Sequence, residues 1–213
     1  PMPDPENHVV EDQTKRQRPK PGERRLQILQ ALASMLEQPG GERITTAALA
    51  ARLQLSEAAL YRHFASKAQM FEALIEFIEQ NVFSLVNQIK DKSEEPAHHR
   101  AGQIVSMLMK FAVKNPGMTR VMVGDALVLE RERLQQRMNL FFDKIEAALR
   151  QCLREAVDAD GDTSSQDVQA RAAVLTAFAR GRLQRYTRSG FNRLPSDQLE
   201  PCLSLMLGMQ RGL

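Results

Sequence analysis

Residues that begin helices recur at short intervals between residues 43 and 67. Thr45 or Thr46 is placed to begin one helix, Ser56 the next, and Ser66 a third. Hydroxyl side chains suit these positions because they accept hydrogen bonds from the free amides of a first helical turn. The first two helices can only be short, and Gln54-Leu55 leaves a tight turn between them. This spacing predicts a helix-turn-helix.

The second short helix has the two faces that a DNA-reading helix requires. Leu49, Leu53, Leu55, Leu60 and Phe64 supply the apolar side of the unit. Glu57, Ala58, Ala59 and Arg62 are left facing outward. Small side chains such as Ala58 and Ala59 allow close approach to bases and can touch thymine methyl groups. We therefore expect these outward residues to read sequence in the major groove.

Hydroxyl and cationic side chains flank this helix where DNA phosphates would run. Thr45 and Thr46 begin a helix whose free amides attract an anion. Tyr61, His63 and Lys67 lie just beyond the recognition helix. Such contacts position a protein on DNA without reading its sequence.

An ordinary helical hairpin is the alternative interpretation of this segment. In it, Tyr61, His63 and Phe64 would be core residues or satisfied surface groups.

Composition predicts helices for the rest of the chain. Aromatic residues make up 5% of the 213 residues and Trp is absent, whereas residues that favour helices are plentiful. Further helices are expected over 24–36, 67–90, 97–114, 117–124, 126–157, 166–188 and 196–210, separated by Pro, Gly or polar loops. The fold class is therefore all-α. The predicted domains are a disordered arm over 1–22, a DNA-binding domain over 23–68 and a helical domain over 69–213.

The positive charge is concentrated in the arm. From Glu11 to Arg25, six Lys and Arg residues stand against three Asp and Glu residues, a difference of +3 that equals the net charge of the whole chain. A basic arm that leads into a helix suits the DNA backbone. For the first ten residues, a solvated tail is an equally good interpretation.

Other classes of function find little support in the sequence. His98 and His99 are adjacent, so they do not form the pair one helical turn apart that a metal site uses. Neither a phosphate-binding loop nor a nucleophile motif is present, and the carboxylates of Glu72, Glu76 and Glu79 are interpreted as a solvated helix face. We expect no enzyme activity, cofactor or metal.

The cellular setting follows from what the sequence lacks. No run approaches the length of a membrane span, and the polar N-terminus has no signal-peptide core. Cys152 and Cys202 have no metal-ligand spacing and are interpreted as small buried hydrophobic residues of a reducing cytosol. A cytoplasmic protein is therefore expected.

The motif around the predicted recognition helix resembles that of the TetR family. Ile44-Thr45-Thr46, Leu60-Tyr61-Arg62-His63-Phe64 and Ser66-Lys67 carry the resemblance. It implies a homodimer that pairs its C-terminal helices as a four-helix bundle and places two recognition helices on a DNA palindrome. It also assigns Tyr61, His63 and Lys67 to phosphate contacts and the arm before Arg25 to the backbone or minor groove.

The C-terminal part is similar to one branch of that family, the bacterial nucleoid occlusion factors. The segments 74–79, 115–117, 131–155 and 185–191 carry this resemblance. It implies a nucleoid-associated protein that binds specific chromosomal sites and captures the C-terminal tail of the division protein FtsZ, which antagonises ring assembly over DNA. Carried over by position, Phe77, Lys110, Lys114 and Asn115 are the candidate residues for binding that tail.

The periodicity of the long helix bears on Phe77. A stripe of apolar residues is expected to be buried, and it consists of Leu74, Ile75, Ile78, Val82, Leu85, Val86 and Ile89. Phe77 falls on a neighbouring and mostly polar stripe, where an exposed aromatic could anchor a peptide. Alternatively, Phe77 widens the core face, and Lys110 and Lys114 are ordinary solvated charges near a helix end.

The chain departs from the pattern of that branch at three positions. Leu85 stands where an arginine is expected, Lys110 near an expected glycine, and Asp125 where a histidine is expected. The alternative function is a ligand-responsive repressor. It would require an apolar cavity, with Met107, Met122, Phe141 and Phe178 as its candidate lining.

Overall fold

The computed structural model describes residues 19–41, 43–160 and 165–208, and the regular elements in these ranges are all helices. In chain order they are α1 (Pro21–Leu36), α2 (Thr46–Arg52), α3 (Glu57–Tyr61), α4 (Lys67–Lys90), α5 (Ala97–Lys114), α6 (Pro116–Met122), the short 3-10 helix η1 (Asp125–Leu127), α7 (Glu132–Asp160), α8 (Ser165–Arg188) and α9 (Leu199–Leu207). The expected all-α class is confirmed.

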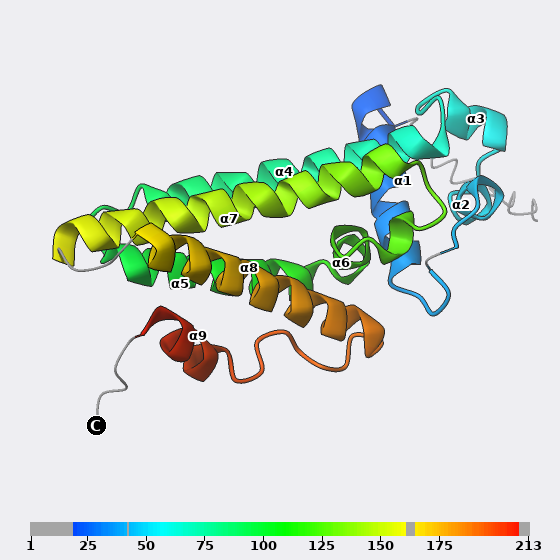
Figure 1. Cartoon of the computed structure of the whole chain (residues 1–213). Coiled ribbons are helices and arrows are strands. Elements are labelled where there is room, and N and C mark those ends of the chain that lie inside the picture. The colour runs from blue at the N-terminus through cyan, green and yellow to red at the C-terminus, as the bar shows by residue number, and fades with distance from the viewer. Residues whose placement is uncertain (1–18, 42, 161–164, 209–213) are drawn as a thin grey trace, which may run out of the picture.

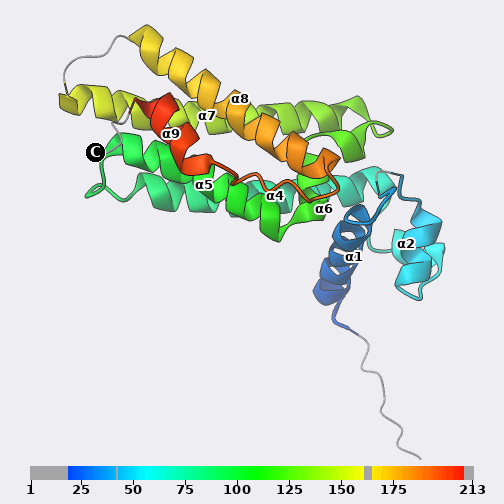
Figure 2. The ribbon, with the colours of Figure 1, turned by 90° about the horizontal axis from the view of Figure 1, so that it is seen from below.

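The helices form two parts of unequal size (Figure 1). Helices α1 to α3 make a small unit at one end, and helices α4 to α8 make an elongated bundle in which α4 and α7 run side by side. Seen from below, α1 and α2 project from the end of the bundle where α6 lies (Figure 2). Helix α9 packs against α5 and α8. The small unit therefore meets the bundle through α4 and α6.

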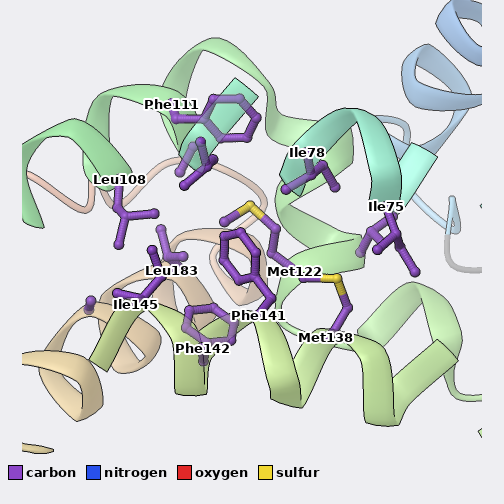
Figure 3. Close-up of a cluster of buried hydrophobic side chains, with 14 of the residues drawn as sticks. Ile75, Ile78, Leu108, Phe111, Met122, Met138, Phe141, Phe142, Ile145 and Leu183 are labelled. Carbon is purple, nitrogen blue, oxygen red and sulfur yellow. The ribbon is translucent and has the colours of Figure 1, made fainter. Parts of the chain in front are cut away.

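The bundle is held by a core of aromatic, aliphatic and methionine side chains (Figure 3). The ring of Phe141 packs edge to face against Phe142 and Phe83, with ring centroids 5.1 Å and 5.3 Å apart. Met122 is 2% exposed and joins the same cluster. Close packing of this kind makes the core a source of stability, because each contact contributes dispersion energy.

The four residues proposed to line a ligand cavity do not share one environment. Met122 and Phe141 are buried in the core. Met107 instead lines a surface groove, and Phe178 is only partly buried beneath the guanidinium of Arg182, 4.7 Å from its ring centroid. The set is divided between core and surface, which weakens the repressor interpretation.

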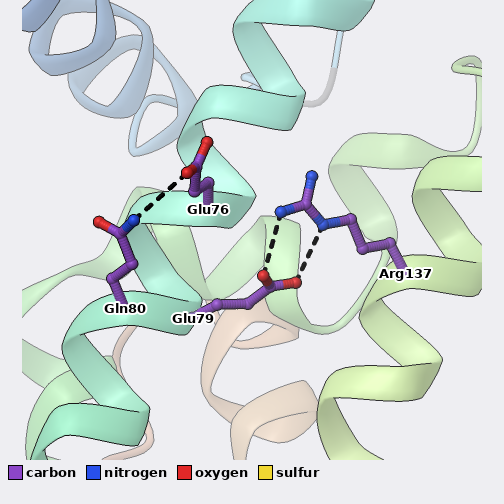
Figure 4. A network of polar contacts seen from close by, with 4 residues as sticks. All are labelled: Glu76, Glu79, Gln80 and Arg137. Carbon is purple, nitrogen blue, oxygen red and sulfur yellow. Dashed lines mark hydrogen bonds and ion pairs between the residues drawn. The ribbon is translucent and has the colours of Figure 1, made fainter.

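Two ion pairs join α4 to α7. Arg137 donates two hydrogen bonds of 3.0 Å to the carboxylate of Glu79, and this bond raises the pKa of Arg137 (Figure 4). Arg133 forms an ion pair with Glu72 through one guanidinium nitrogen. The interpretation of these carboxylates as a solvated face was therefore wrong for Glu72 and Glu79. Their partners lie more than fifty residues away in sequence, beyond the reach of helical periodicity.

A close backbone contact joins α1 to α6. A Cβ atom built on Gly117 would lie 2.0 Å from the backbone oxygen of Ala33, so only glycine fits there. Beside it, Arg120 donates hydrogen bonds to the carbonyl oxygens of Leu36 and Gln38, at 2.7 Å and 2.8 Å. Leu36 is the last residue of α1, where carbonyls have no partner within the helix, and Gln38 lies in the turn that follows. The contact fixes the small unit against the bundle.

Several predicted helix boundaries were wrong for local reasons. The helix expected over 126–157 begins only at Glu132, because Gly124 has a φ of +89° and a 3-10 turn follows it. Helix α9 begins at Leu199 because Gln198 is left-handed, with a φ of 55°. Helix α1 begins at Pro21, as proline favours the first helical position. The arm expected over 1–22 therefore gives up its last two residues to α1, and residues 1–18 lie outside the described ranges.

The two cysteines differ in their surroundings. Cys152 is buried, and burial raises the pKa of its thiol, which keeps the reactive thiolate scarce. Cys202 is only partly buried, and its Sγ accepts a contact of 3.5 Å from Arg182. The expectation of two buried cysteines is therefore met at Cys152 alone.

Replacing Gly117 with alanine tests the contact between α1 and α6. We expect Gly117→Ala to lower the free energy of unfolding by about 1–3 kcal/mol, because the new methyl group meets backbone that cannot rotate away. Chemical denaturation measures this change. The matched control is Gly22→Ala, whose added Cβ meets no atom within 4 Å. Equal effects of the two substitutions would contradict the close approach.

Candidate functional site

Side-chain caps fix the helix-turn-helix at both of its helix starts. The hydroxyl oxygen of Thr45 accepts a hydrogen bond from the amide of Ala48, and that of Ser56 accepts one from Ala59, both at 3.1 Å. Between the helices, Gln54 has a φ of 55°, in the left-handed region that permits a tight turn. The turn and caps set the angle at which α3 leaves α2.

Helix α3 presents a polar and small-residue face to solvent. Glu57, Ala58 and Arg62 are exposed and Ala59 is half-buried. The opposite side is anchored by Leu60, which is fully buried. A helix of this length with small outward residues can enter a groove of B-form DNA and contact base edges.

A hydrogen-bond network that the sequence did not predict links α2 to α3. The Thr46 hydroxyl donates to the carboxylate of Glu57 at 3.0 Å, and the Tyr61 hydroxyl donates to the Thr46 oxygen at 3.3 Å. Tyr61 remains exposed. The network therefore orients Tyr61 and draws the carboxylate of Glu57 toward α2, so that negative charge is held in place beside the hydroxyl groups.

The segment that follows α3 is tied to α1 through Arg25. Its guanidinium donates to the carbonyl oxygen of His63 and lies 4.2 Å from the ring centroid of Phe64. His63 is half-buried. The sequence placed Arg25 at the end of a basic arm, whereas the structure uses it to hold the segment that follows α3.

Lys67 has a carboxylate partner that the sequence gave no sign of. Its ammonium nitrogen lies 2.7 Å from Oε1 of Glu130, in the segment between η1 and α7. The Lys67 side chain is 32% exposed, whereas that of Glu130 is 10% exposed. The residue expected to meet a phosphate therefore already holds an anion. The two residues are far apart in sequence, so helical spacing could not reveal the pair.

A second feature is a surface groove of about 430 Å³ beside α4 and α5. Its lining residues are Leu85, Ile89, Lys92, Gln103, Ser106, Met107, Lys110, Phe111, Lys114 and Asn115. Three lysines and no carboxylate stand among them. The groove brings together three of the four residues predicted to bind a partner, namely Lys110, Lys114 and Asn115.

Phe77 lies outside the residues that line this groove. It is 36% exposed, as its place on the polar stripe of α4 predicted. Leu85 is 38% exposed, so its expected burial was wrong, and it lines the groove instead. Eight residues of helix separate Phe77 from Leu85, or about 12 Å along the axis. Phe77 therefore lies on α4 between the groove and the small unit.

Two kinds of site are absent from the described ranges. No helix in them is long and apolar enough to cross a membrane. In the same ranges, no group of three or more His, Cys, Asp or Glu side chains is placed to hold a metal ion.

Two family descriptions match the chain in succession. Residues 28–74 match the bacterial regulatory proteins of the tetR family. Residues 96–210 match the SlmA-like Tetracyclin repressor-like C-terminal domain. The gap between these matches, residues 75–95, covers most of α4 and the loop before α5.

Relatives match across both parts. The nucleoid occlusion factor SlmA of Alteromonas mediterranea is 48% identical over 175 residues, which cover 82% of this chain and 89% of that protein. The factor of the same name from Vibrio cholerae is 47% identical, with 86% of this chain and 93% of that protein covered. Its counterpart from Photobacterium profundum is 47% identical, with 87% and 96% covered.

Solved structures of low identity share the fold. The fatty acid degradation regulator FadR from Bacillus halodurans superposes with a TM-score of 0.71 at 16% identity, covering 92% of this chain and all of that chain. FadR from Bacillus subtilis, solved with stearoyl-CoA, gives a TM-score of 0.68 at 13% identity, covering 87% of this chain and 99% of that chain. At these identities the likeness concerns the arrangement of helices alone.

The exposed hydroxyl of Tyr61 can be tested directly. We expect Tyr61→Phe to weaken binding to duplex DNA by about three- to tenfold, because one hydroxyl able to contact a phosphate is lost. Stability should change by less than about 1 kcal/mol, since the ring is exposed. Electrophoretic mobility shift and thermal denaturation give these two results.

The chain offers a matched control in its one other tyrosine, Tyr186, which is buried. Tyr186→Phe should leave DNA affinity unchanged. If both substitutions weaken DNA binding equally, Tyr61 is not part of the interface.

Proposed function

Because the chain belongs to the family of the nucleoid occlusion factor SlmA, within the TetR family, we propose that it binds specific chromosomal DNA sites and, while bound there, captures the C-terminal tail of FtsZ. The outcome would be antagonism of division-ring assembly over the nucleoid. Identity of 47–48% across both the helix-turn-helix and the bundle is the observation that carries this proposal. The names of these relatives are those of regulators rather than enzymes.

DNA is bound through α2 and α3 in this proposal. Glu57, Ala58, Ala59 and Arg62 face the bases, and Thr45, Thr46, Tyr61, His63 and Lys67 contact phosphates. The exposed α3 face and the oriented hydroxyls of Thr46 and Tyr61 support this assignment. The basic residues of the N-terminal arm, outside the described ranges, would add contacts to the backbone or minor groove.

The protein acts as a homodimer, which presents two copies of α3 to the DNA. The exposed apolar side chains Leu140 on α7 and Val174 on α8, 51% and 52% exposed, support a pairing surface along these helices. On α8, the position of Gly181 leaves open space above the helix, which permits close approach of another helix. In a two-fold dimer, this face of one protomer would pack against the same face of its partner.

The groove beside α4 and α5 receives the partner tail. The ammonium groups of Lys92, Lys110 and Lys114 make its rim positive, which suits the carboxylates of a peptide and its C-terminus. Side-chain Oε1 of Gln103 is buried and has no hydrogen-bond partner. An unpaired buried acceptor in a groove is satisfied when a peptide amide donates to it.

Two of the three departures of this chain from its branch fall at the groove itself. Leu85 takes away one expected positive charge, and Lys110 adds one nearby, and both residues line the groove. We infer that positive charge moves from the α4 side to the α5 side while its total is kept. Phe77 and Asn115 complete the proposed contact, with Phe77 extending it along α4 toward the DNA-binding unit.

The proposal is tested with a fluorescently labelled peptide of the FtsZ C-terminal tail. We expect anisotropy titrations to show saturable binding that becomes tighter when a selected DNA duplex is present. Lys114→Ala should weaken peptide binding by about tenfold because a charge pair in the groove is lost. Phe77→Ala should weaken it at a cost in unfolding free energy well below the roughly 3–5 kcal/mol of a fully buried phenylalanine, since the residue is 36% exposed.

Lys144 on α7 supplies the control, because it is exposed and outside the groove lining. Lys144→Ala should change peptide affinity by less than about twofold. An absence of peptide binding with and without DNA would contradict the FtsZ part of the proposal. The protein would then be studied as a ligand-responsive repressor.

A further inference from the structure

The pair between Lys67 and Glu130 joins two parts of the protein that sequence separates. Lys67 is the first residue of α4 and lies a few residues after the recognition helix α3. Glu130 belongs to the segment 124–131 that connects α6 to α7. With a separation of 2.7 Å and a carboxylate side chain only 10% exposed, this contact is shielded from solvent more than an ordinary surface ion pair.

The site at Lys67 needs an anion for a second reason. A helix of 24 residues carries positive partial charge at its N-terminus, where its first amides lack partners within the helix. Ser66 accepts a hydrogen bond from the amide of Gln69 but carries no charge. A lysine at this end adds positive charge where helices favour negative charge. The carboxylate of Glu130 offsets both sources in the free protein.

The segment that carries Glu130 is anchored in the core by Ala126 and Leu127, but its later residues are held at few points. Gly124 begins it with a φ of +89°, and Gln135 of α7 donates to the Gly124 carbonyl oxygen at 3.1 Å. Within it, the amide of Glu130 donates to Leu127 at 3.0 Å. Val128 and Leu129 are 70% and 71% exposed, so they contribute little packing.

The segment also lies where the two parts of the protein meet. A hollow of about 450 Å³ is lined by Arg43 of the DNA-binding unit and by Arg120, Asp125, Val128, Leu129 and Thr187 of the bundle. A change in the position of this segment would therefore alter the surroundings of residues in both the small unit and the bundle.

We propose that Glu130 is an internal substitute for a DNA phosphate, which occupies Lys67 in the free protein and is displaced when DNA binds. Displacement frees the end of the segment 124–131 that carries Glu130 from the start of α4. DNA binding is thereby signalled to the bundle by the loss of one ion pair. This inference rests on the DNA-binding part of the proposed function and adds a regulatory contact to it.

Counterion release gives the proposal a quantitative signature. A free lysine that contacts a phosphate releases a condensed cation, which steepens the salt dependence of DNA affinity. When Lys67 must first leave Glu130, the freed carboxylate attracts a cation again, so the net release is smaller. Removing the charge of Glu130 should therefore both tighten DNA binding and steepen its salt dependence.

The test compares Glu130→Gln with the unaltered protein in DNA titrations over a range of salt concentrations. We expect the affinity of Glu130→Gln to rise by about three- to tenfold at low salt, with the log–log salt slope steeper by about one unit. In a Lys67→Gln background, Glu130→Gln should change affinity by less than about twofold, because no lysine remains to be released. A fall in affinity, or an equal gain in both backgrounds, would overturn the proposal.

Glu132→Gln is the matched control for general repulsion between carboxylates and DNA. Glu132 is exposed, lies two residues further along and contacts Gln136 rather than Lys67. It should change DNA affinity by less than about twofold. A gain equal to that of Glu130→Gln would show that the ion pair itself is irrelevant.

Hydrogen exchange of the free protein tests the segment without relying on DNA. We expect the amides of residues 127–130 to exchange faster in Glu130→Gln than in the unaltered protein, because the segment has lost its attachment to α4. Adding DNA should speed the same amides in the unaltered protein and leave Glu130→Gln unchanged. Equal exchange in the two free proteins would overturn the proposal even if DNA binding itself is confirmed.

Discussion

The backbone contact between α1 and α6 holds the small unit against the bundle. Gly117 lets the backbone of α6 reach the carbonyl of Ala33, and Arg120 donates to the carbonyls of Leu36 at the end of α1 and of Gln38 in the turn beyond it. Backbone contact leaves less freedom than side-chain packing, because neither partner can change rotamer. It sets the position of the helix-turn-helix relative to the bundle, and through that position the orientation of α3.

Helix α4 carries the features of both candidate sites along one rigid element. Lys67 lies at its start, Phe77 in its first half and Leu85 beside the groove in its second half. Two ion pairs to α7, through Glu72 and Glu79, hold its exposed side to the bundle. A change at the DNA end of α4 is therefore mechanically connected to the groove, and the segment with Glu130 lies beside that same end.

Local patterns predicted the helices well where the signal is local. Ser56 and Ser66 cap α3 and α4 as expected, because a cap is made by residues three positions apart. The exposure of Phe77 likewise follows from its angle on a single helix. Boundaries failed where a backbone conformation decided them, as at Gly124 and Gln198. The prediction that Leu85 is buried was wrong, because the periodicity of one helix cannot show how far along it a neighbouring helix packs.

From the chain alone one could predict the helical class, the helix-turn-helix with its outward residues, and the family resemblance, since each depends on spacing along one helix or on a short motif. The partners of Lys67, Glu79 and Thr46, and the residues that share the groove with Lys114, became known from the packing of the helices. The physical reason is distance along the chain. Ion pairs and grooves join residues from different helices, whose relative placement is fixed by packing of the whole core and leaves no periodic trace in the sequence.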